Sequence, residues 1–230
     1  MARLTFLETF DIRDLPAAVP ETHPGGGLSL VSGATALTLT GALAAYRPKL
    51  ATAVPLEQGE LTRGDALVVR VEEIGLAPVL LTGKTGAAFA RELLSENDRI
   101  IGARGDDRLL GFAGDDRVTG GRGADIMTGG GGADVFRFTA LSDSVADNTD
   151  RITDFRSGRD MIDLRGIDAE HGVMGDQAFD FIAGAGFSGV AGELRWTGRA
   201  LEADVTGDGI ADFALRLGRA HMPEADDFLL

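Results

Sequence analysis

Aspartate returns at every ninth residue in the middle of this chain, and these side chains could hold a metal ion. They are Asp98, Asp107, Asp116, Asp125 and Asp134. An apolar residue stands two places after each aspartate, and glycines stand two and five places before each of the last four. The chain has no cysteine and the repeat has no histidine, so the available ligands are carboxylate and carbonyl oxygens. Oxygen ligands suit Ca²⁺, which takes about six to eight of them, whereas softer metals prefer nitrogen or sulfur.

The repeat also dictates the elements that must position these aspartates. Its unit is Gly-x-x-Gly-x-Asp-x-apolar-x, as in residues 120–128. The first six residues form a turn, for which glycine supplies positive φ, and the other three form a very short strand with one inward apolar side chain. One unit cannot bury that side chain alone, so successive units must stack around a shared core. Two units then complete one coil, and each turn faces the turn two units later across a gap lined by aspartates and carbonyls.

Residues 93–138 resemble the RTX nonapeptide repeats, or haemolysin-type calcium-binding repeats, which fold as a parallel β-roll. The first copy, 93–101, has lost both glycines and is interpreted as a terminal cap. Residues 136–170 include the sequence Asp150-Arg-Ile-Thr-Asp154-Phe155 and then Gly158-Arg-Asp160-Met-Ile-Asp163. They resemble the segment that follows the β-roll in serralysin-type C-terminal domains. The resemblance covers residues 93–230, about three-fifths of the chain.

This resemblance implies which atoms would bind calcium. One turn would supply the carbonyls of its second and fourth residues and its aspartate, and the turn two units later the carbonyls of its first and third residues and its aspartate. The first implied site joins Ala103, Gly105 and Asp107 to Gly120, Arg122 and Asp125. The second joins Phe112, Gly114 and Asp116 to Gly129, Gly131 and Asp134, and a third, at the capped end, uses Asp98 with Gly111, Ala113 and Asp116. Further sites would join Gly121, Gly123 and Asp125, or Gly130, Gly132 and Asp134, to acids beyond the repeat, with Asp143 and Asp150 as candidates.

Alternating segments outside the repeat predict more β-strands, so the expected fold class is all-β: a parallel β-roll flanked by antiparallel strands. The expected N-terminal strands are 28–30, 36–40, 66–71 and 78–82, and the C-terminal ones are 193–197, 201–205 and 213–217. Residues 206–209, Thr-Gly-Asp-Gly, predict a hairpin turn. One short helix is expected over 87–94, where it leads into the first repeat and caps the N-terminal end of the roll.

The expected organisation therefore has three regions. They are a β-rich region over 1–92, the β-roll over 93–138, and a serralysin-like β region over 139–230. A solenoid needs a cap to cover its open edge and apolar end, and residues 1–92 are the candidate for it. The alternative is an independent binding domain of unknown ligand, and the sequence does not decide between the two.

Charge and composition exclude several classes of protein. Residues 1–95 carry 10 acidic and 8 basic side chains and residues 96–230 carry 26 and 14, so most of the net charge of −14 belongs to the repeat and the residues after it. Nucleic-acid binding needs a basic surface, which this sequence does not provide.

No apolar run is long enough for a transmembrane segment. Serralysins are zinc proteases, but the sequence has no His-Glu-x-x-His motif, and its histidines at 23, 171 and 221 are interpreted as ordinary surface residues.

Residues 204–212 partly resemble an EF-hand loop, because their pattern is Asp-x-Thr-x-Asp-Gly-x-x-Asp. The twelfth position of such a loop would be Leu215, where EF-hands have a bidentate glutamate. A plain hairpin connection is therefore the favoured interpretation of this segment, and metal binding there stays open.

These features predict a secreted, non-enzymatic calcium-binding protein of the RTX type. The N-terminus lacks the apolar segment of a Sec signal peptide, whereas the ending Asp226-Asp227-Phe228-Leu229-Leu230 is similar to the C-terminal signal that bacterial type I secretion machinery reads. The chain would leave the cell unfolded and be folded outside by Ca²⁺.

The sequence leaves three hypotheses for the role of the chain. The first is an adhesive, matrix or surface-structural role, with self-association or retention at the cell surface. The second is an accessory or regulatory partner of a secreted enzyme. The third, a small enzyme with its site in residues 1–90, is disfavoured because no catalytic constellation of His, Cys or Ser occurs there.

Overall fold

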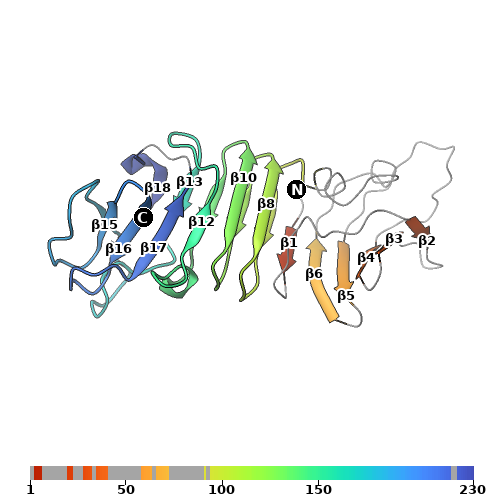
Figure 1. Ribbon diagram of the computed structural model, residues 1–230, viewed down its shortest axis with the longest axis horizontal. Helices are drawn as coiled ribbons and strands as arrows, with labels where there is room; N and C mark the ends of the chain where they lie inside the picture. Colours follow the sequence, from red (N-terminus) through yellow and green to blue (C-terminus); the bar gives the residue numbers. More distant parts are fainter. Residues whose placement is uncertain are drawn as a thin grey trace.

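The computed structural model describes residues 3–6, 20–22, 28–32, 35–40, 58–63, 66–72, 91, 94–218 and 222–230, and before residue 91 it describes backbone strands alone. Within these residues the chain forms β-strands and short 3-10 helices (Figure 1). The strands up to the end of the repeat are β1 (Arg3–Phe6), β2 (Pro20–Thr22), β3 (Leu28–Ser32), β4 (Thr35–Thr40), β5 (Gln58–Arg63), β6 (Ala66–Glu72), β7 (Arg99–Ile101), β8 (Arg108–Ala113), β9 (Arg117–Thr119), β10 (Ile126–Gly131) and β11 (Val135–Arg137). The later elements are η3 (Leu141–Asp143), β12 (Asp150–Ile152), β13 (Met161–Asp163), β14 (Asp180–Phe181), β15 (Glu193–Trp196), β16 (Ala200–Asp204), β17 (Phe213–Leu217), η4 (Ala225–Asp227) and β18 (Phe228–Leu229).

The middle of the chain is a parallel β-roll, as the repeat predicts. Strands β7, β9, β11 and β13 pair in parallel in one sheet, and β8, β10 and β12 pair in parallel in the other, where they lie side by side in Figure 1. Ile100 lies opposite Val118, which lies opposite Phe136. Since these partners are two repeat units apart, two units complete one coil.

The inward apolar residues of the repeat form the core of the roll. Those two places after each aspartate are fully buried: Ile100, Leu109, Val118, Met127 and Phe136. The same core continues beyond the repeat, where Phe138 and Phe213 meet edge to face with ring centroids 5.2 Å apart. Burying one such side chain contributes about 1.5–3 kcal/mol, so the roll is stabilised by the stack of coils rather than by any single unit.

Two strands of the roll are longer than the three residues that the repeat predicts. Strands β8 and β10 each have six residues, because their pairing continues from Thr128 opposite Leu110 to Gly130 opposite Phe112. The first three residues of each of these turns therefore still pair in parallel with the stacked turn. The turn glycines have no side chain, and this lets the two backbones continue to approach each other.

The N-terminal strands extend one sheet of the roll. Strand β1 pairs in parallel with β7, so that Leu4 lies opposite Ile100, and β6, β5, β4, β3 and β2 follow as antiparallel neighbours. Strands β3, β4 and β6 confirm three predicted strands, whereas β1, β2 and β5 were not predicted. The strand expected at 78–82 lies outside the described residues, and of the expected helix over 87–94 only Arg91, which is helical, and Leu94 are described. Strand β1 therefore lies beside the first strand of the roll, and the capping role of residues 1–92 stays a prediction.

The C-terminal strands complete both sheets. Strands β15, β16 and β17 form the predicted antiparallel arrangement, and β17 then pairs in parallel with β12. Strand β18 pairs in parallel with β13, and the ring of Phe228 lies 4.7 Å from that of Phe181, centroid to centroid. The segment proposed as an export signal is therefore a strand of the folded protein. Among the described residues, no helix is both long and apolar enough to span a bilayer.

Candidate calcium-binding turns

The aspartates of the repeat lie in two columns, one along each row of turns. Asp98, Asp116 and Asp134 form the first column, and Asp107 and Asp125 begin the second. In the first, the backbone N–H of Asp98 donates to Oδ1 of Asp116 at 2.8 Å, and that of Asp116 donates to Oδ1 of Asp134 at 3.0 Å. In the second, the N–H of Asp107 donates to Oδ1 of Asp125 at 2.8 Å. Turns two units apart are therefore stacked, as predicted, and two carboxylates flank each gap between them.

The first glycine of a turn leaves room for the aspartate of the same turn. A Cβ atom on Gly129 would overlap Oδ2 of Asp134, and the same holds one and two units earlier. The second glycine of a turn is required for a different reason. Gly132 has φ +127°, and a Cβ atom there would overlap the carbonyl oxygen of Gly114 in the preceding coil. The two glycines thus let the carboxylate and the neighbouring backbone enter the gap together.

Carbonyl oxygens reach the gaps from both turns. The carbonyl oxygens of Ala103 and Gly105 lie against Gly121 and Gly123 of the next coil, and the carbonyl oxygen of Gly120 lies against Gly102. The same contacts recur in the other column, where the carbonyls of Phe112 and Gly114 lie against Gly130 and Gly132, and that of Gly129 against Gly111. These are carbonyls of the second and fourth residues of one turn and the first residue of the next coil's turn, which belong to the predicted ligand pattern.

Each column contains carboxylate oxygens that no group of the described protein satisfies. The Oδ2 atoms of Asp116, Asp125, Asp134 and Asp150 are buried and accept no hydrogen bond. Burial, followed by the charges of neighbouring aspartates, raises the pKa of Asp116 to about 8, of Asp125 to about 7, of Asp134 to about 6 and of Asp150 to about 8. A backbone N–H bond to each carboxylate only partly offsets this increase in pKa. Burying an ionised carboxylate without a partner costs folding free energy, so a cation bound beside these oxygen atoms would stabilise the fold.

The donor set fits Ca²⁺. The gaps between Asp107 and Asp125 and between Asp116 and Asp134 each bring together two carboxylates and several carbonyl oxygens, which are the hard ligands that Ca²⁺ takes in flexible, irregular cages. Within the described part of the chain, no three side chains of His, Cys, Asp or Glu converge to hold a metal, so the carbonyls are needed to complete the coordination. A bound Ca²⁺ would supply the positive charge that the facing carboxylates lack.

The predicted ligand residues fall into these stacked turns. The turns 102–107 and 120–125 contain Ala103, Gly105, Asp107, Gly120, Gly121, Arg122, Gly123 and Asp125. The turns 111–116 and 129–134 contain Gly111, Phe112, Ala113, Gly114, Asp116, Gly129, Gly130, Gly131, Gly132 and Asp134. The carbonyl of Gly131 also accepts the N–H of Gly114 at 2.7 Å, which leaves one of its two lone pairs for a metal.

One of the two acids proposed beyond the repeat continues a column. Asp150 follows Asp125, whose N–H donates to Oδ1 of Asp150 at 2.8 Å. Asp143 lies close enough for its charge to raise the pKa of both, but its Oδ2 accepts the N–H groups of Thr139 and Ala140 within its own 3-10 turn.

The site proposed to join Gly130, Gly132 and Asp134 to Asp143 or Asp150 is wrong. Asp134 lies in the first column, and its N–H donates to Oδ1 of Asp160 at 3.3 Å. The segment between β11 and β12 carries Asp150 into the second column, beside Asp125. The residue that follows Asp134 in its column is therefore Asp160, which the sequence pattern did not identify as a ligand.

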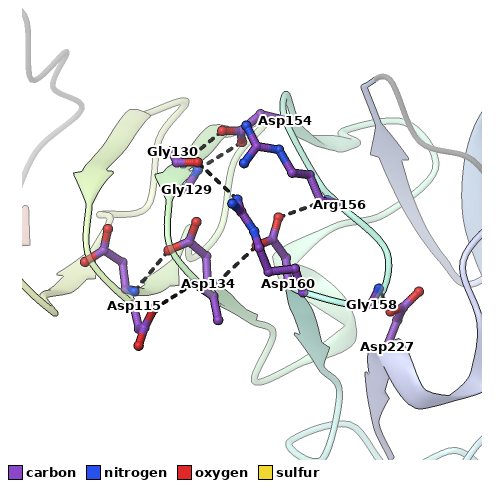
Figure 2. A network of polar contacts seen from close by, with 12 residues as sticks. Asp115, Gly129, Gly130, Asp134, Asp154, Arg156, Gly158, Asp160 and Asp227 are labelled. Atoms are coloured by element: carbon purple, nitrogen blue, oxygen red, sulfur yellow. Dashed lines mark hydrogen bonds and ion pairs between the residues drawn. The ribbon is translucent and has the colours of Figure 1, made fainter.

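Asp160 belongs to a degenerate turn of the roll, residues 155–160. Gly158 stands two places before it and Ile162 two places after it, as in the repeat. The N–H of Arg156 donates to Oδ2 of Asp160 at 2.9 Å (Figure 2). The equivalent N–H of Ala103 likewise donates to Oδ2 of Asp107, the aspartate of its own turn, at 2.6 Å. The glycine and the apolar residue could have revealed this turn. It stands 26 residues after Asp134, however, so a strict period of nine does not reach it.

The carboxylates in the loop between β16 and β17 accept hydrogen bonds from the backbone of the same loop. Oδ1 of Asp204 accepts the N–H groups of Thr206 and Gly207, and Oδ2 accepts that of Gly209. Oδ2 of Asp212 accepts the N–H of Val205 at 2.9 Å. This is the hairpin connection that the sequence favoured, with the side chains closing the turn.

The metal-free roll is expected to lose stability as the pH rises. A carboxyl group whose pKa is higher in the folded than in the unfolded chain stabilises the fold below its unfolded pKa, and this contribution is lost as the pH rises through the folded pKa. For Asp116 and Asp150 that window extends from 3.8 to about 8. In a chelator, the chain should therefore retain more β-sheet circular dichroism at about pH 5 than at about pH 9. Saturating Ca²⁺ should remove or reverse this order, because a bound cation favours the ionised carboxylates. A metal-free β-sheet signal that increases with pH would contradict the assignment.

The match to a known protein family covers the same residues as this geometry. Residues 82–229, well over half of the chain, match the family model described as peptidase M10 serralysin C terminal. Two similar solved structures are the AlgE6R3 and AlgE6R2 subunits of a mannuronan C5-epimerase from Azotobacter vinelandii. Each is 27% identical over 59% of this chain; the first is covered over 78% with a TM-score of 0.38, and the second over 88% with a TM-score of 0.40.

No curated protein matches the chain. The family match and the stacked turns are sufficient to assign the chain to a family, because both identify the same repeat region. This chain belongs to the peptidase M10 serralysin C-terminal family, whose non-catalytic repeat domains are calcium-binding RTX β-rolls.

Proposed function

We propose that this chain binds Ca²⁺ in the gaps between its stacked turns and that this binding folds the roll. The gaps lie between Asp98 and Asp116, Asp116 and Asp134, Asp107 and Asp125, and Asp125 and Asp150. The observation that carries the proposal is the set of buried Oδ2 atoms at Asp116, Asp125, Asp134 and Asp150, which have no hydrogen-bond partner among the described residues. Two carboxylates and the turn carbonyls would hold the ion in each gap.

Loss of Asp116 is expected to remove more calcium than loss of Asp98. Asp116 lies between two stacked neighbours and borders two gaps, whereas Asp98 borders one. Isothermal titration should show Asp116→Ala losing two ions and Asp98→Ala losing one at most. Asp208→Ala is the control, because this exposed residue lies in the hairpin after β16 and should leave the number of ions unchanged. Equal losses in the two column variants would contradict the stacking assignment, and a wild-type chain that binds no calcium would overturn the proposal itself.

The second part of the proposed function is secretion by a type I route, with the tail 226–230 as its signal. Calcium modules outside cells bind at roughly 10⁻⁴–10⁻³ M, far above free intracellular Ca²⁺, so the roll would stay unfolded before export. In the folded chain Asp227 is buried, and its Oδ1 accepts the N–H of Gly158 at 2.7 Å. Phe228 is buried against the core. A transporter could therefore read this tail only before the roll folds.

Deleting residues 227–230 is expected to retain the protein in the producing cell. The matched control is Asp116→Ala in the full chain, which weakens calcium binding but keeps the tail and should still be exported. Immunoblots of medium and cells, with a cytosolic marker to detect lysis, measure the distribution. Normal amounts of the truncated protein in the medium would contradict the signal assignment.

The final role that we propose is non-enzymatic, in adhesion, a matrix or a surface structure. It is supported by the family match, which covers a non-catalytic repeat domain. The alternative role is that of an accessory partner of a secreted enzyme. Capture of the tagged protein from calcium-containing culture medium separates the two, because it would recover copies of the same chain or cell-surface material in one case and a single soluble enzyme in the other.

A further inference from the structure

The last gap of the first column contains a cation that belongs to the protein. The degenerate turn 155–160 stacks on the turn 129–134, with Asp160 against Asp134 (Figure 2). Arg159 enters this gap from the degenerate turn. Its Nη2 donates to the carbonyl oxygen of Gly130 at 3.2 Å, and its Nε lies 3.2 Å from Oδ1 of Asp160. Gly130 is the second residue of its turn, and in the other gaps that carbonyl position is assigned to calcium.

The position of Arg159 within its turn is not basic anywhere else in the roll. The equivalent residues, each directly before the column aspartate, are Asn97, Asp106, Asp115, Ala124 and Ala133. The oxygens of the first three accept an N–H one coil further along, as when Oδ1 of Asp115 accepts the N–H of Ala133 at 2.7 Å. Arg159 instead reaches back by one coil, toward the preceding turn. The substitution therefore places a guanidinium where the regular repeat leaves oxygen ligands alone.

The neighbouring groups are arranged around this positive charge. Both oxygens of Asp154 are engaged by the backbone, accepting the N–H of Gly129 at 3.0 Å and that of Gly130 at 2.8 Å (Figure 2). This bonding fixes the turn whose carbonyl Arg159 contacts. Asp134 borders the same gap, since its N–H donates to Oδ1 of Asp160 at 3.3 Å.

We propose that the guanidinium of Arg159 takes the place of a calcium ion in the gap between Asp134 and Asp160. This inference rests on the proposed calcium sites in the other gaps. A guanidinium offers several N–H donors in a fixed plane and can contact a carbonyl and a carboxylate together, as Arg159 does here. The first column therefore closes at its C-terminal end without metal, and the roll binds one ion fewer than its number of gaps.

The test is to count bound calcium in the full chain after Arg159→Gln. Glutamine removes the charge and frees the carbonyl of Gly130 and the carboxylate of Asp160, so we expect one more Ca²⁺ per chain than in the wild type by equilibrium dialysis. The variant should also need more calcium than the wild type to reach half-maximal folding. Arg156→Gln is the matched control, because it removes the same charge from the same turn while its backbone N–H, which contacts Asp160, remains. It should bind the wild-type number of ions.

An unchanged number of ions in a folded Arg159→Gln variant would overturn the inference, while calcium binding by the wild type would still support the proposed function. If Arg159→Gln does not fold at any calcium concentration, Arg159→Lys decides. A lysine keeps the positive charge, so folding with the wild-type number of ions would support a required cation in this gap. Failure of Arg159→Lys to fold as well would show that the side chain acts through its shape, and the inference would be wrong.

Discussion

Removal of calcium is expected to unfold the roll rather than to loosen it locally. Each gap places two carboxylates near each other, and buried Oδ2 atoms in both columns have no partner in the part of the chain that the structure describes. A site at ten times its Kd adds about 1.4 kcal/mol of stability, so the four proposed sites together add about 5–6 kcal/mol. This is comparable with the whole stability of a typical domain, about 5–15 kcal/mol. Chelation should therefore abolish the cooperative transition of the roll.

Circular dichroism and thermal melts before and after addition of a calcium chelator measure this effect. Re-addition of Ca²⁺ should restore the β-sheet spectrum and the melting transition. Magnesium at the same concentration is the control and should not restore them, because Mg²⁺ requires near-ideal octahedral geometry that an irregular cage of carbonyls does not provide. Identical spectra and melting temperatures with and without chelator would refute calcium-dependent folding.

Replacement of Gly132 by alanine is expected to destabilise the calcium-bound protein by more than about 4 kcal/mol, an exceptional cost for one methyl group. Gly132 has φ +127°, and its missing Cβ would overlap the carbonyl oxygen of Gly114. Gly114 and Gly132 directly follow the paired strands β8 and β10, and the N–H of Gly114 donates to the carbonyl oxygen of Gly131 at 2.7 Å, so neither backbone can move far without disturbing the stack. Because that carbonyl is also a proposed calcium ligand, the number of bound ions should decrease with the stability.

Gly198→Ala separates the two causes of this destabilisation. Gly198 has φ +86°, but a Cβ atom there would meet nothing within 4 Å. Its replacement therefore costs only the strain of a left-handed conformation, about 1–2 kcal/mol, and leaves calcium binding unchanged. Chemical denaturation of both variants in saturating calcium gives the comparison. Similar losses of stability would mean that the gap between turns is not as closely packed as the structure indicates.

The sequence alone determined the parts of this protein that depend on local chemistry and a short period. The nine-residue spacing predicted the two-unit coil, because only stacking could bury Ile100, Leu109 and the other inward residues. The absence of thiols and the recurring aspartates predicted oxygen ligands. Alternation predicted β15, β16 and β17. Each of these inferences uses residues that are close together in the chain or related by one constant period.

Only the tertiary structure decided how the roll ends. The segment between β11 and β13 interrupts the period, so the partner of Asp134 is Asp160, which no fixed spacing selects. The same interruption places Arg159 against Gly130, and it lets the terminal strand β18 pair with β13. At the other end, β1 pairs with β7 although the two strands are far apart in the chain. Such contacts depend on which strand edges remain unpaired after the coils have stacked. The packing of the whole core determines those edges, and no local sequence pattern does.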